Sequence, residues 1–264
     1  MGRSKDGAAG SGKASSSASS KGSKTSARVA QTAAGSAAAS TRKVTAFYSD
    51  RPGKLYREFS NFYRDAQVPP FKFVLPEYAR REGLPEQVEC KFSEKAIMLV
   101  KAALMGDAEA FKAIAVGPDP KSCKDLGRKV KNFDEDRWTS HLEETAYEVV
   151  RQKFTSCKLL RDVLLSTGDS ILAEAAPNDS VWGIGLKIDD ERVDDPSKWC
   201  GQNALGRALM QVRSHLRGEP VEVRRARDTA VADDAAGDAA LGQDPAEDED
   251  FLRPVDDLEA VRAE

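Results

Sequence analysis

The chain has 264 residues, a formal net charge of -3 and four cysteines. Residues 1–43 are rich in Ser, Ala, Gly and Lys, and residues 219–264 are strongly acidic. Both ends carry too little apolar surface to offset the entropy of ordering, so we predict disordered tails around one domain at residues 44–218. The near-neutral middle lacks a broad basic footprint for nucleic acid. No apolar run is long enough to span a membrane.

The cysteines and histidines are too scattered to indicate a metal site. Cys90, Cys123, Cys157 and Cys200 form no C-x-x-C pair, and the chain has two histidines. We therefore predict reduced thiols, no metal site and no organic cofactor. The first residues lack the apolar core of a secretory signal. We expect a cytoplasmic location, with the nucleus or an organelle as the alternatives.

Short β-type runs open the domain. Val44–Tyr48 is the first predicted strand, and a second begins at Phe71 after two prolines. The stretch Pro76–Glu89 is charged and contains prolines, which favours a loop and suggests an insertion.

Helical spacing of apolar residues dominates the remainder of the domain. Ser93 is the predicted N-cap of the first helix, because its hydroxyl can accept a free amide hydrogen. Asp107 is the predicted cap of a second helix at 108–115, and a third helix is predicted at 118–130. Asp134 is the predicted cap of the longest helix, in which apolar residues from Trp138 to Phe154 recur at helical spacing. Another helix is predicted at 157–166, with Leu159 and Leu160 facing the core. A strand at 171–175 follows, and Asn203 is the predicted cap of a final helix. The predicted fold class is mainly α with a few short β-strands (α+β).

The stretch from Asp169 to Arg213 contains the densest group of candidate site residues. It places acids, an amide, a Trp and two glycines within twelve positions that lack helical periodicity. Glu174 lies in an apolar strand, where a carboxylate is costly to bury unless it is paired or functional. Asp179 could orient a hydroxyl or cap a turn, and Trp182 could stack on a planar ring or fill the core.

Glu94 is the other candidate carboxylate. In the first turn of a helix it would feel the positive end of the helix dipole, which predicts a lowered pKa and an ionised side chain. Such a group suits a base or a stabiliser of positive charge. The alternative is that Glu94 only stabilises the start of the helix.

Several motifs in order resemble the YbiA-like family, also called NADAR domains. The matching residues extend from about Val44 to Leu216: Phe47-Tyr48, Phe59-Ser60-Asn61-Phe62, Ser93-Glu94, Lys101-Ala102, Gly127-Arg128-Lys129-Val130, Trp138, Lys153-Phe154, Leu164-Leu165-Ser166-Thr167-Gly168, Leu172-Ala173-Glu174-Ala175, Asn178-Asp179, Trp182-Gly183-Ile184-Gly185, Trp199-Cys200-Gly201-Gln202-Asn203-Ala204-Leu205-Gly206 and Leu209-Met210-Gln211-Val212-Arg213.

The resemblance implies a compact, mostly helical N-glycosidase. Characterised relatives cut the ribosyl C–N bond of reactive ribosylaminopyrimidine phosphates made early in riboflavin synthesis, so a small phosphorylated ribosyl compound is the expected partner. The alternatives are a hydrolase of ADP-ribosyl-guanine or an NAD-related compound, and a non-catalytic ADP-ribose-binding module. Nucleic acid is a partner only under the ADP-ribosyl-guanine alternative, and no membrane partner is expected.

Under this resemblance, Glu94, Glu174 and Asp179 are the predicted catalytic residues, because an anionic carboxylate stabilises a cation-like sugar. Substrate binding is predicted for a second set, in which Arg128 would pair with phosphate and Trp182 would stack on the base: Asn61, Lys101, Arg128, Trp138, Trp182, Gly183 and Asn203.

The chain departs from the family pattern in three places. Many bacterial members carry His-Tyr and then Phe-Gln after the Ser-Glu pair, whereas this chain has Lys95-Ala96-Ile97-Met98. The Pro76–Glu89 stretch precedes Glu94 and could reshape the entrance to the site. The stretch Asp189–Lys198 is longer and more acidic than the usual connection. These departures leave the substrate less well defined than the fold.

Overall fold

A computed structural model describes residues 42–221. The predicted tails, residues 1–43 and 219–264, therefore fall almost wholly outside the described residues. The strands are β1 (Val44–Phe47), β2 (Phe71–Val74), β3 (Gln87–Cys90) and β4 (Ile171–Glu174). The helices are α1 (Ser93–Leu104), α2 (Ala108–Ala115), α3 (Pro120–Arg128), α4 (Glu135–Ser156), α5 (Lys158–Ser166) and α6 (Ala204–Leu216). Short 3-10 turns lie at Arg57–Phe59, Glu77–Ala79 and Pro196–Lys198. The mainly α class with a few short strands is confirmed.

The strands form two separate two-stranded sheets. β1 pairs with β4 in parallel, which sets Val44 opposite Ile171 and Phe47 opposite Glu174. β2 pairs with β3 in an antiparallel register, with Phe71 opposite Cys90. The first sheet joins segments more than 120 residues apart and fixes where the end of β4 lies.

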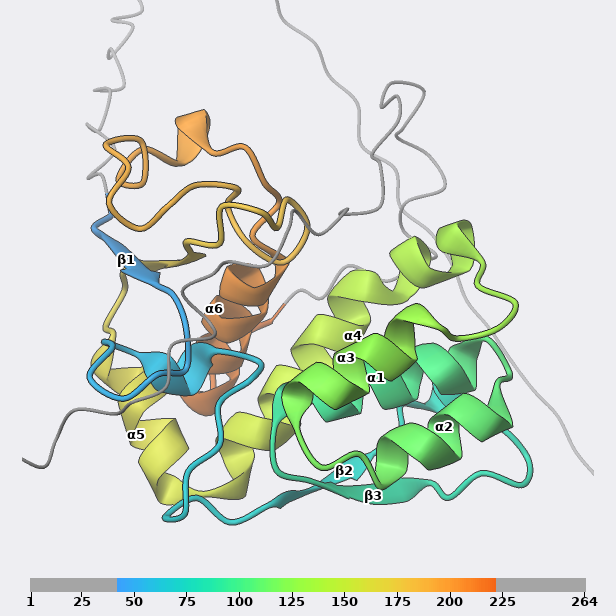
Figure 1. The fold of residues 1–264 in the computed structure, drawn as a ribbon. Coiled ribbons are helices and arrows are strands. Elements are labelled where there is room, and N and C mark those ends of the chain that lie inside the picture. Colours follow the sequence, from blue (N-terminus) through green and yellow to red (C-terminus); the bar gives the residue numbers. More distant parts are fainter. Residues whose placement is uncertain (1–41, 222–264) are drawn as a thin grey trace, which may run out of the picture. The chain divides into compact units, whose positions relative to one another are not determined.

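Helix α4 is the central support. It contacts α1 and β2 on one side and α5 and α6 on the other, as Figure 1 shows. One buried cluster gathers α1, α2, β2 and β3, and another gathers α4, α5 and α6 around Phe47 and Phe59. Trp182 packs against both clusters, so the loop after β4 lies at their junction.

Four local predictions need correction. The predicted loop at 76–89 contains the start of β3, because Val88 pairs with Phe73 across the small sheet. Leu159 is 40% exposed rather than in the core. Ser93 is the first residue of α1 and its hydroxyl makes no cap bond; Phe92 occupies the N-cap position. Asn203 does occupy the N-cap position of α6, but its side chain bonds β4 instead of the helix.

The predicted caps at Asp107 and Asp134 are confirmed. Asp107 accepts a hydrogen bond from the backbone of Ala110, and Asp134 accepts one from Arg137. Both aspartates satisfy amides that the first turn of a helix leaves free. Among the described residues, no helix combines the length and apolar character needed to cross a bilayer.

Candidate active site

Glu94 is held at the start of α1 by a loop from far upstream. Its backbone amide donates to the carbonyl oxygen of Asn61 at 2.9 Å. The neighbouring carbonyl of Ser60 accepts a hydrogen bond of 2.9 Å from the buried ammonium of Lys153 on α4. The Ser60-Asn61 segment is thereby fixed between α1 and α4, and it fixes the position of Glu94 in turn.

Glu174 ends β4 and is held by Asn203. The backbone amide of Glu174 donates to the Asn203 side-chain oxygen at 3.1 Å, and the Asn203 amide nitrogen donates to the Leu172 carbonyl at 2.8 Å. Asn203 adopts a left-handed backbone with φ of 54°. Both polar groups of this side chain are used to clamp β4, so Asn203 positions Glu174.

The loop after β4 folds back tightly on the strand. The amide of Ile184 donates to the Glu174 carbonyl at 2.8 Å, and the amide of Asn203 donates to the Gly183 carbonyl at 2.9 Å. A Cβ at Gly183 would lie 2.9 Å from both the Ala176 Cβ and the Glu174 carbonyl oxygen. The close approach therefore requires glycine at this position.

Asp179 caps a turn in this loop and also contributes charge to the site. One of its carboxylate oxygens accepts hydrogen bonds from the amides of Val181 at 3.0 Å and Trp182 at 2.7 Å. Its negative charge raises the pKa of both Glu94 and Glu174. The Asp179 turn thus places Trp182 and a third carboxylate beside the first two.

The structure brings the three predicted catalytic carboxylates together. Burial, with a further contribution from the negative charge of Asp179, raises the pKa of Glu94 to about 7 against the lowering effect of Lys124, Arg128 and Lys101. This corrects the predicted lowering by the helix dipole, because loss of water around a 7% exposed carboxylate outweighs a partial charge at a helix end.

Glu174 has an even higher pKa. Burial, together with the negative charges of Asp179 and Glu94, raises the pKa of Glu174 to about 8, although the charge of Lys124 lowers it. The residue as a whole is partly exposed, but its Oε2 atom is buried and lacks a hydrogen-bond partner. At neutral pH, therefore, Glu174 favours the protonated form, and Glu94 is close to its midpoint.

Basic side chains lie on α1 and α3 beside the carboxylates. Lys101 is two helical turns after Glu94 on the same face of α1. Between them, Met98 contacts α3 so closely that a Cβ at Gly127 would lie 1.9 Å from its sulfur. Lys124 and Arg128 flank that contact on α3. This packing sets three cations around the acidic group.

Lys124 was missed by the sequence reasoning. Its positive charge lowers the pKa of both Glu94 and Glu174, and its ammonium lies 5.8 Å from the centre of the Phe62 ring. The spacing in the sequence could have indicated this residue, since Lys124 precedes Arg128 by four residues and lies on the same helical face. Lys153 was named only as part of a motif.

Two predicted binding residues lie at the edge of this group. Trp138 contacts Lys101, whose ammonium lies 5.9 Å from the Trp138 ring and 4.4 Å from that of Phe133. Arg128 is exposed and forms an ion pair of 3.2 Å with Asp125. Arg128 interacts with Glu94 through its charge, and Trp138 is linked to the acidic group through its contact with Lys101.

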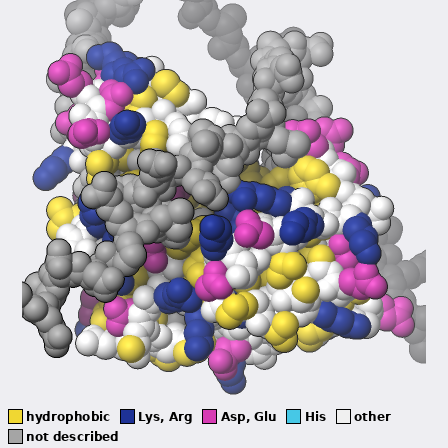
Figure 2. Space-filling model, viewed as in Figure 1, with side chains coloured by type: hydrophobic (Ala, Val, Ile, Leu, Met, Phe, Trp, Pro, Cys, Tyr) yellow, Lys and Arg dark blue, Asp and Glu magenta, His cyan; other side chains and the backbone are white. Residues whose placement is uncertain are grey.

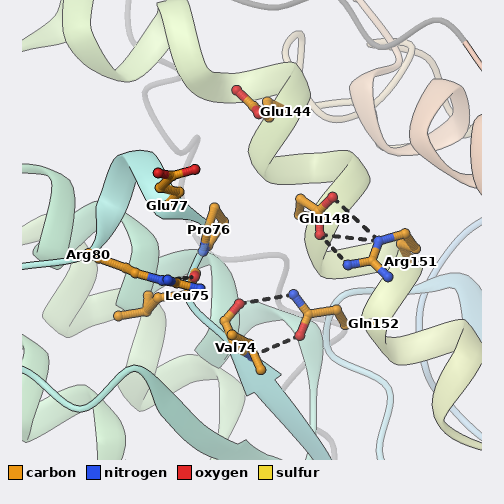
Figure 3. Close-up of a pocket in the computed structure, with 9 residues that line it drawn as sticks. All are labelled: Val74, Leu75, Pro76, Glu77, Arg80, Glu144, Glu148, Arg151 and Gln152. Atoms are coloured by element: carbon orange, nitrogen blue, oxygen red, sulfur yellow. Dashed lines mark hydrogen bonds and ion pairs between the residues drawn. The ribbon is translucent and has the colours of Figure 1, made fainter.

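A separate cavity of about 520 Å³ lies between β2 and α4. In Figure 3, Arg151 pairs with Glu148, at 2.6 Å, and Arg80 donates to the backbone carbonyl of Leu75. Gln152 pairs its side-chain amide with both backbone groups of Val74. The candidate catalytic residues do not line this cavity, and we do not assign the site to it.

Among residues 42–221, no group of three or more His, Cys, Asp or Glu side chains could hold a metal ion. The acidic group instead has Lys101, Lys124 and Arg128 as its neighbours.

The NADAR domain model matches residues 46–217. This chain belongs to the NADAR domain family. The resemblance drawn from the sequence motifs is thereby confirmed, and the matched range includes every element from β1 to α6 except the first two residues of β1.

Relatives of this NADAR domain include proteins named as enzymes. An N-glycosidase of Acanthamoeba polyphaga mimivirus is 37% identical over 143 residues, which are 54% of this chain and 82% of the relative. Protein irg-1 of Caenorhabditis elegans is 34% identical over 60% of this chain and 74% of its own length. An N-glycosidase of Nostoc punctiforme is 32% identical over 42% of this chain and 64% of its own. The enzyme class predicted from the sequence is the class named for two of these relatives.

A solution NMR structure of the E. coli protein YbiA aligns with 67% of this chain and 86% of its own, with a TM-score of 0.48 and 25% identity.

Proposed function

We propose that this NADAR domain is a hydrolase that cleaves the C–N bond between a ribosyl group and a nitrogen base. The observation that carries the proposal is the pair of buried carboxyl groups of Glu94 and Glu174, whose pKa values of about 7 and about 8 lie at and just above neutral pH. One carboxyl ionised beside one protonated is the arrangement that acid–base cleavage of a glycosidic bond uses.

The proposed reaction uses each carboxyl group differently. Protonated Glu174 donates its proton to the departing nitrogen as the C–N bond breaks. The sugar then carries positive charge at its anomeric carbon, and Asp179 and ionised Glu94 stabilise that charge. Water adds to the same carbon and gives its proton to Glu94. Trp182 is proposed to stack against the base, and Asn61 to bind the ribosyl group.

The neighbouring cations support a phosphorylated substrate. Lys101, Lys124 and Arg128 all lie within electrostatic range of Glu94, where their positive charges lower its pKa. Lysine and arginine side chains bind phosphate groups, so these cations could hold the phosphate of a ribosyl substrate beside the carboxylates. We therefore propose ribosylaminopyrimidine phosphates as the substrate class. Riboflavin biosynthesis proteins of Zea mays and Arabidopsis thaliana are also relatives, at 34% and 37% identity over 42% and 31% of this chain.

The test is release of ribose 5-phosphate from a synthetic ribosylaminopyrimidine 5-phosphate. Glu94→Gln and Glu174→Gln should each lower kcat by about 100-fold to 10,000-fold. Each substitution replaces a proton-transferring carboxyl group by an amide of nearly the same size. Glu82→Gln, an exposed change, is the matched control. Full activity of the Glu94→Gln variant would remove that residue from the mechanism.

Two other compounds, tested in parallel, distinguish the proposed function from its two alternatives, an ADP-ribosyl hydrolase and a non-catalytic binding module. Turnover of ADP-ribosylated guanine in DNA would indicate the ADP-ribosyl hydrolase, and tight binding of ADP-ribose without turnover would indicate a binding module. Figure 2 shows Lys and Arg side chains interspersed with acidic side chains on the visible face. Such a surface favours a small phosphorylated substrate over a polynucleotide.

A further inference from the structure

Three buried side-chain atoms among residues 42–221 lack a hydrogen-bond partner: Asn61 Oδ1, Ser93 Oγ and Glu174 Oε2. All three belong to residues around Glu94. Ser93 precedes it, Asn61 accepts its backbone amide, and Glu174 interacts with its charge. A buried polar atom without a partner is costly, so such atoms gathered at one place indicate a ligand that supplies the missing bonds. The proposed reaction uses Glu174 and gives Asn61 a general role in binding the ribosyl group, but it leaves Ser93 without a role and does not say which hydroxyls are bound.

Ser93 is buried to 1% exposure but performs no capping task. Side chains on an α-helix tilt toward its N-terminus, and Ser93 is the first residue of α1. The next amide along the helix bonds the Asn61 carbonyl at 2.9 Å. The Ser93 hydroxyl therefore belongs to the end of α1 that adjoins Asn61.

Asn61 is 8% exposed and lies in a rigid segment. Lys153 holds the preceding carbonyl, and the Ser60 hydroxyl accepts the amide of Phe62 at 3.1 Å. The backbone of Asn61 is therefore held on both sides, and its side-chain oxygen is buried without a partner. Its oxygen is therefore preorganised for a donor that arrives with a ligand.

We propose that Ser93 binds the 2-hydroxyl and Asn61 the neighbouring 3-hydroxyl of a ribosyl group, which makes the site selective for ribosyl over 2-deoxyribosyl compounds. This inference rests on the proposed function and names its specificity. The chemistry of the pair favours a sugar diol. The Asn61 oxygen is an acceptor and would repel an anion, whereas a hydroxyl can donate to it and can also exchange a hydrogen bond with Ser93.

The experiment measures binding without bond cleavage. Ribose 5-phosphate and 2-deoxyribose 5-phosphate are titrated calorimetrically into the wild-type chain and into Ser93→Ala. The wild type should bind the ribose compound more tightly. Ser93→Ala should weaken ribose 5-phosphate binding by about tenfold and leave 2-deoxyribose 5-phosphate binding unchanged, since one hydroxyl contact is lost.

Thermal unfolding separates this role from a structural one. Ser93→Ala removes a hydroxyl without a partner, so the Tm should stay within about 3 °C of the wild type or rise. Thr145→Val is the matched control: the buried Thr145 hydroxyl bonds the Tyr78 hydroxyl at 2.8 Å. The control should lower Tm and keep the wild-type preference between the two sugars.

Three results would overturn the inference: equal binding of both sugars by the wild type, an equal loss for both sugars in Ser93→Ala, or a Tm that falls as far as in Thr145→Val. If a chain that hydrolyses the ribosylaminopyrimidine phosphate shows one of these results, the hydroxyl subsite is wrong and the hydrolase stands. Absence of both turnover and sugar binding would overturn the two proposals together.

Discussion

At the scale of single residues, burial decides the chemistry of the site. Glu94 and Glu174 have carboxyl groups whose charged forms lose water on folding, and the cations around them only partly compensate. The result is a pair of acids that hold protons at a pH where exposed carboxylates are ionised. Perturbed acids of this kind cluster at functional sites.

The first prediction concerns the pH dependence of turnover. If Glu94 must be ionised and Glu174 protonated, kcat/KM should follow a bell-shaped curve that rises near pH 7 and falls near pH 8. Steady-state rates between pH 5 and pH 10 measure this curve. Residual activity in Glu174→Gln should lack the alkaline fall. A flat profile in the wild type would argue against acid–base roles for the pair.

The second prediction concerns stability. Glu94 has a pKa of about 7 in the folded chain against an ordinary value of 4.5, so the folded state binds more protons between these pH values. Stability should therefore fall as pH rises through this window, by at most roughly 3 kcal/mol. Glu94→Gln should become more stable than the wild type at pH 8 and show little difference at pH 4.

Urea denaturation at pH 4, 6 and 8 measures this difference, with Glu82→Gln as the exposed control. A stability difference that is independent of pH would mean that Glu94 is not a desolvated carboxylate in the folded chain.

The third prediction has the opposite sign. Burial lowers the pKa of Lys153 from 10.5 to about 7, so the unfolded chain binds more protons between these values. The lysine therefore favours the folded state increasingly as pH rises from 7 to 10.5, by up to roughly 5 kcal/mol. The wild type should gain stability relative to Lys153→Met over this range. Chemical denaturation compares the two, and Lys112→Met, an exposed change, should show no such trend.

At the scale of elements, the contact between α1 and α3 brings charge to the carboxylates. Gly127 on α3 leaves no room for a side chain against Met98 on α1. This contact sets Lys124 and Arg128 beside the Glu94 face of α1. The site therefore depends on helix packing as well as on the residues that would contact substrate.

The fourth prediction tests this packing. Gly127→Ala puts a methyl group where the Met98 sulfur lies, so Met98 must move or the helices must separate. We expect a loss of about 1–3 kcal/mol in unfolding free energy. We also expect a higher KM for the phosphorylated substrate, because the α3 cations shift. Lys121→Ala, on the exposed surface of α3, is the control. Unchanged KM and stability would show that the helices accommodate the methyl group.

At the scale of the whole molecule, the described elements pack together around buried hydrophobic clusters. Three buried clusters account for the packing of β1 to α6 in the part of the chain that the structure describes. The family match also falls inside this range. Residues 42–221 thus have the size and core expected of an independently folding domain.

The fifth prediction concerns the independent folding of residues 42–221. A shortened chain of residues 42–221 should unfold cooperatively, with a Tm within about 3 °C of the full chain, and should keep its kcat. Calorimetry and the ribose 5-phosphate assay measure the two properties. A substantially lower Tm or a lost activity would show that the remaining residues contribute to the domain.

The sequence by itself determined which residues are candidates and where most elements begin. Asp107 and Asp134 mark helix starts because capping is a local interaction between a side chain and nearby amides. The motifs also identified the NADAR family and the three carboxylates. These features depend on neighbours within a few residues, which the sequence displays directly.

Only the tertiary structure decided what those residues can do. The position of Glu94 at a helix start predicted a lowered pKa. In the folded domain, burial removes water from its carboxyl group and the pKa is raised to about 7. The sequence pattern also predicted that Ser93 and Asn203 cap helices. In the structure, the Asn203 side chain bonds β4, and the Ser93 hydroxyl has no hydrogen-bond partner. Lys124 joins the site because α3 packs on α1. Desolvation and long-range contacts depend on which distant segments meet, and that is fixed by the fold as a whole.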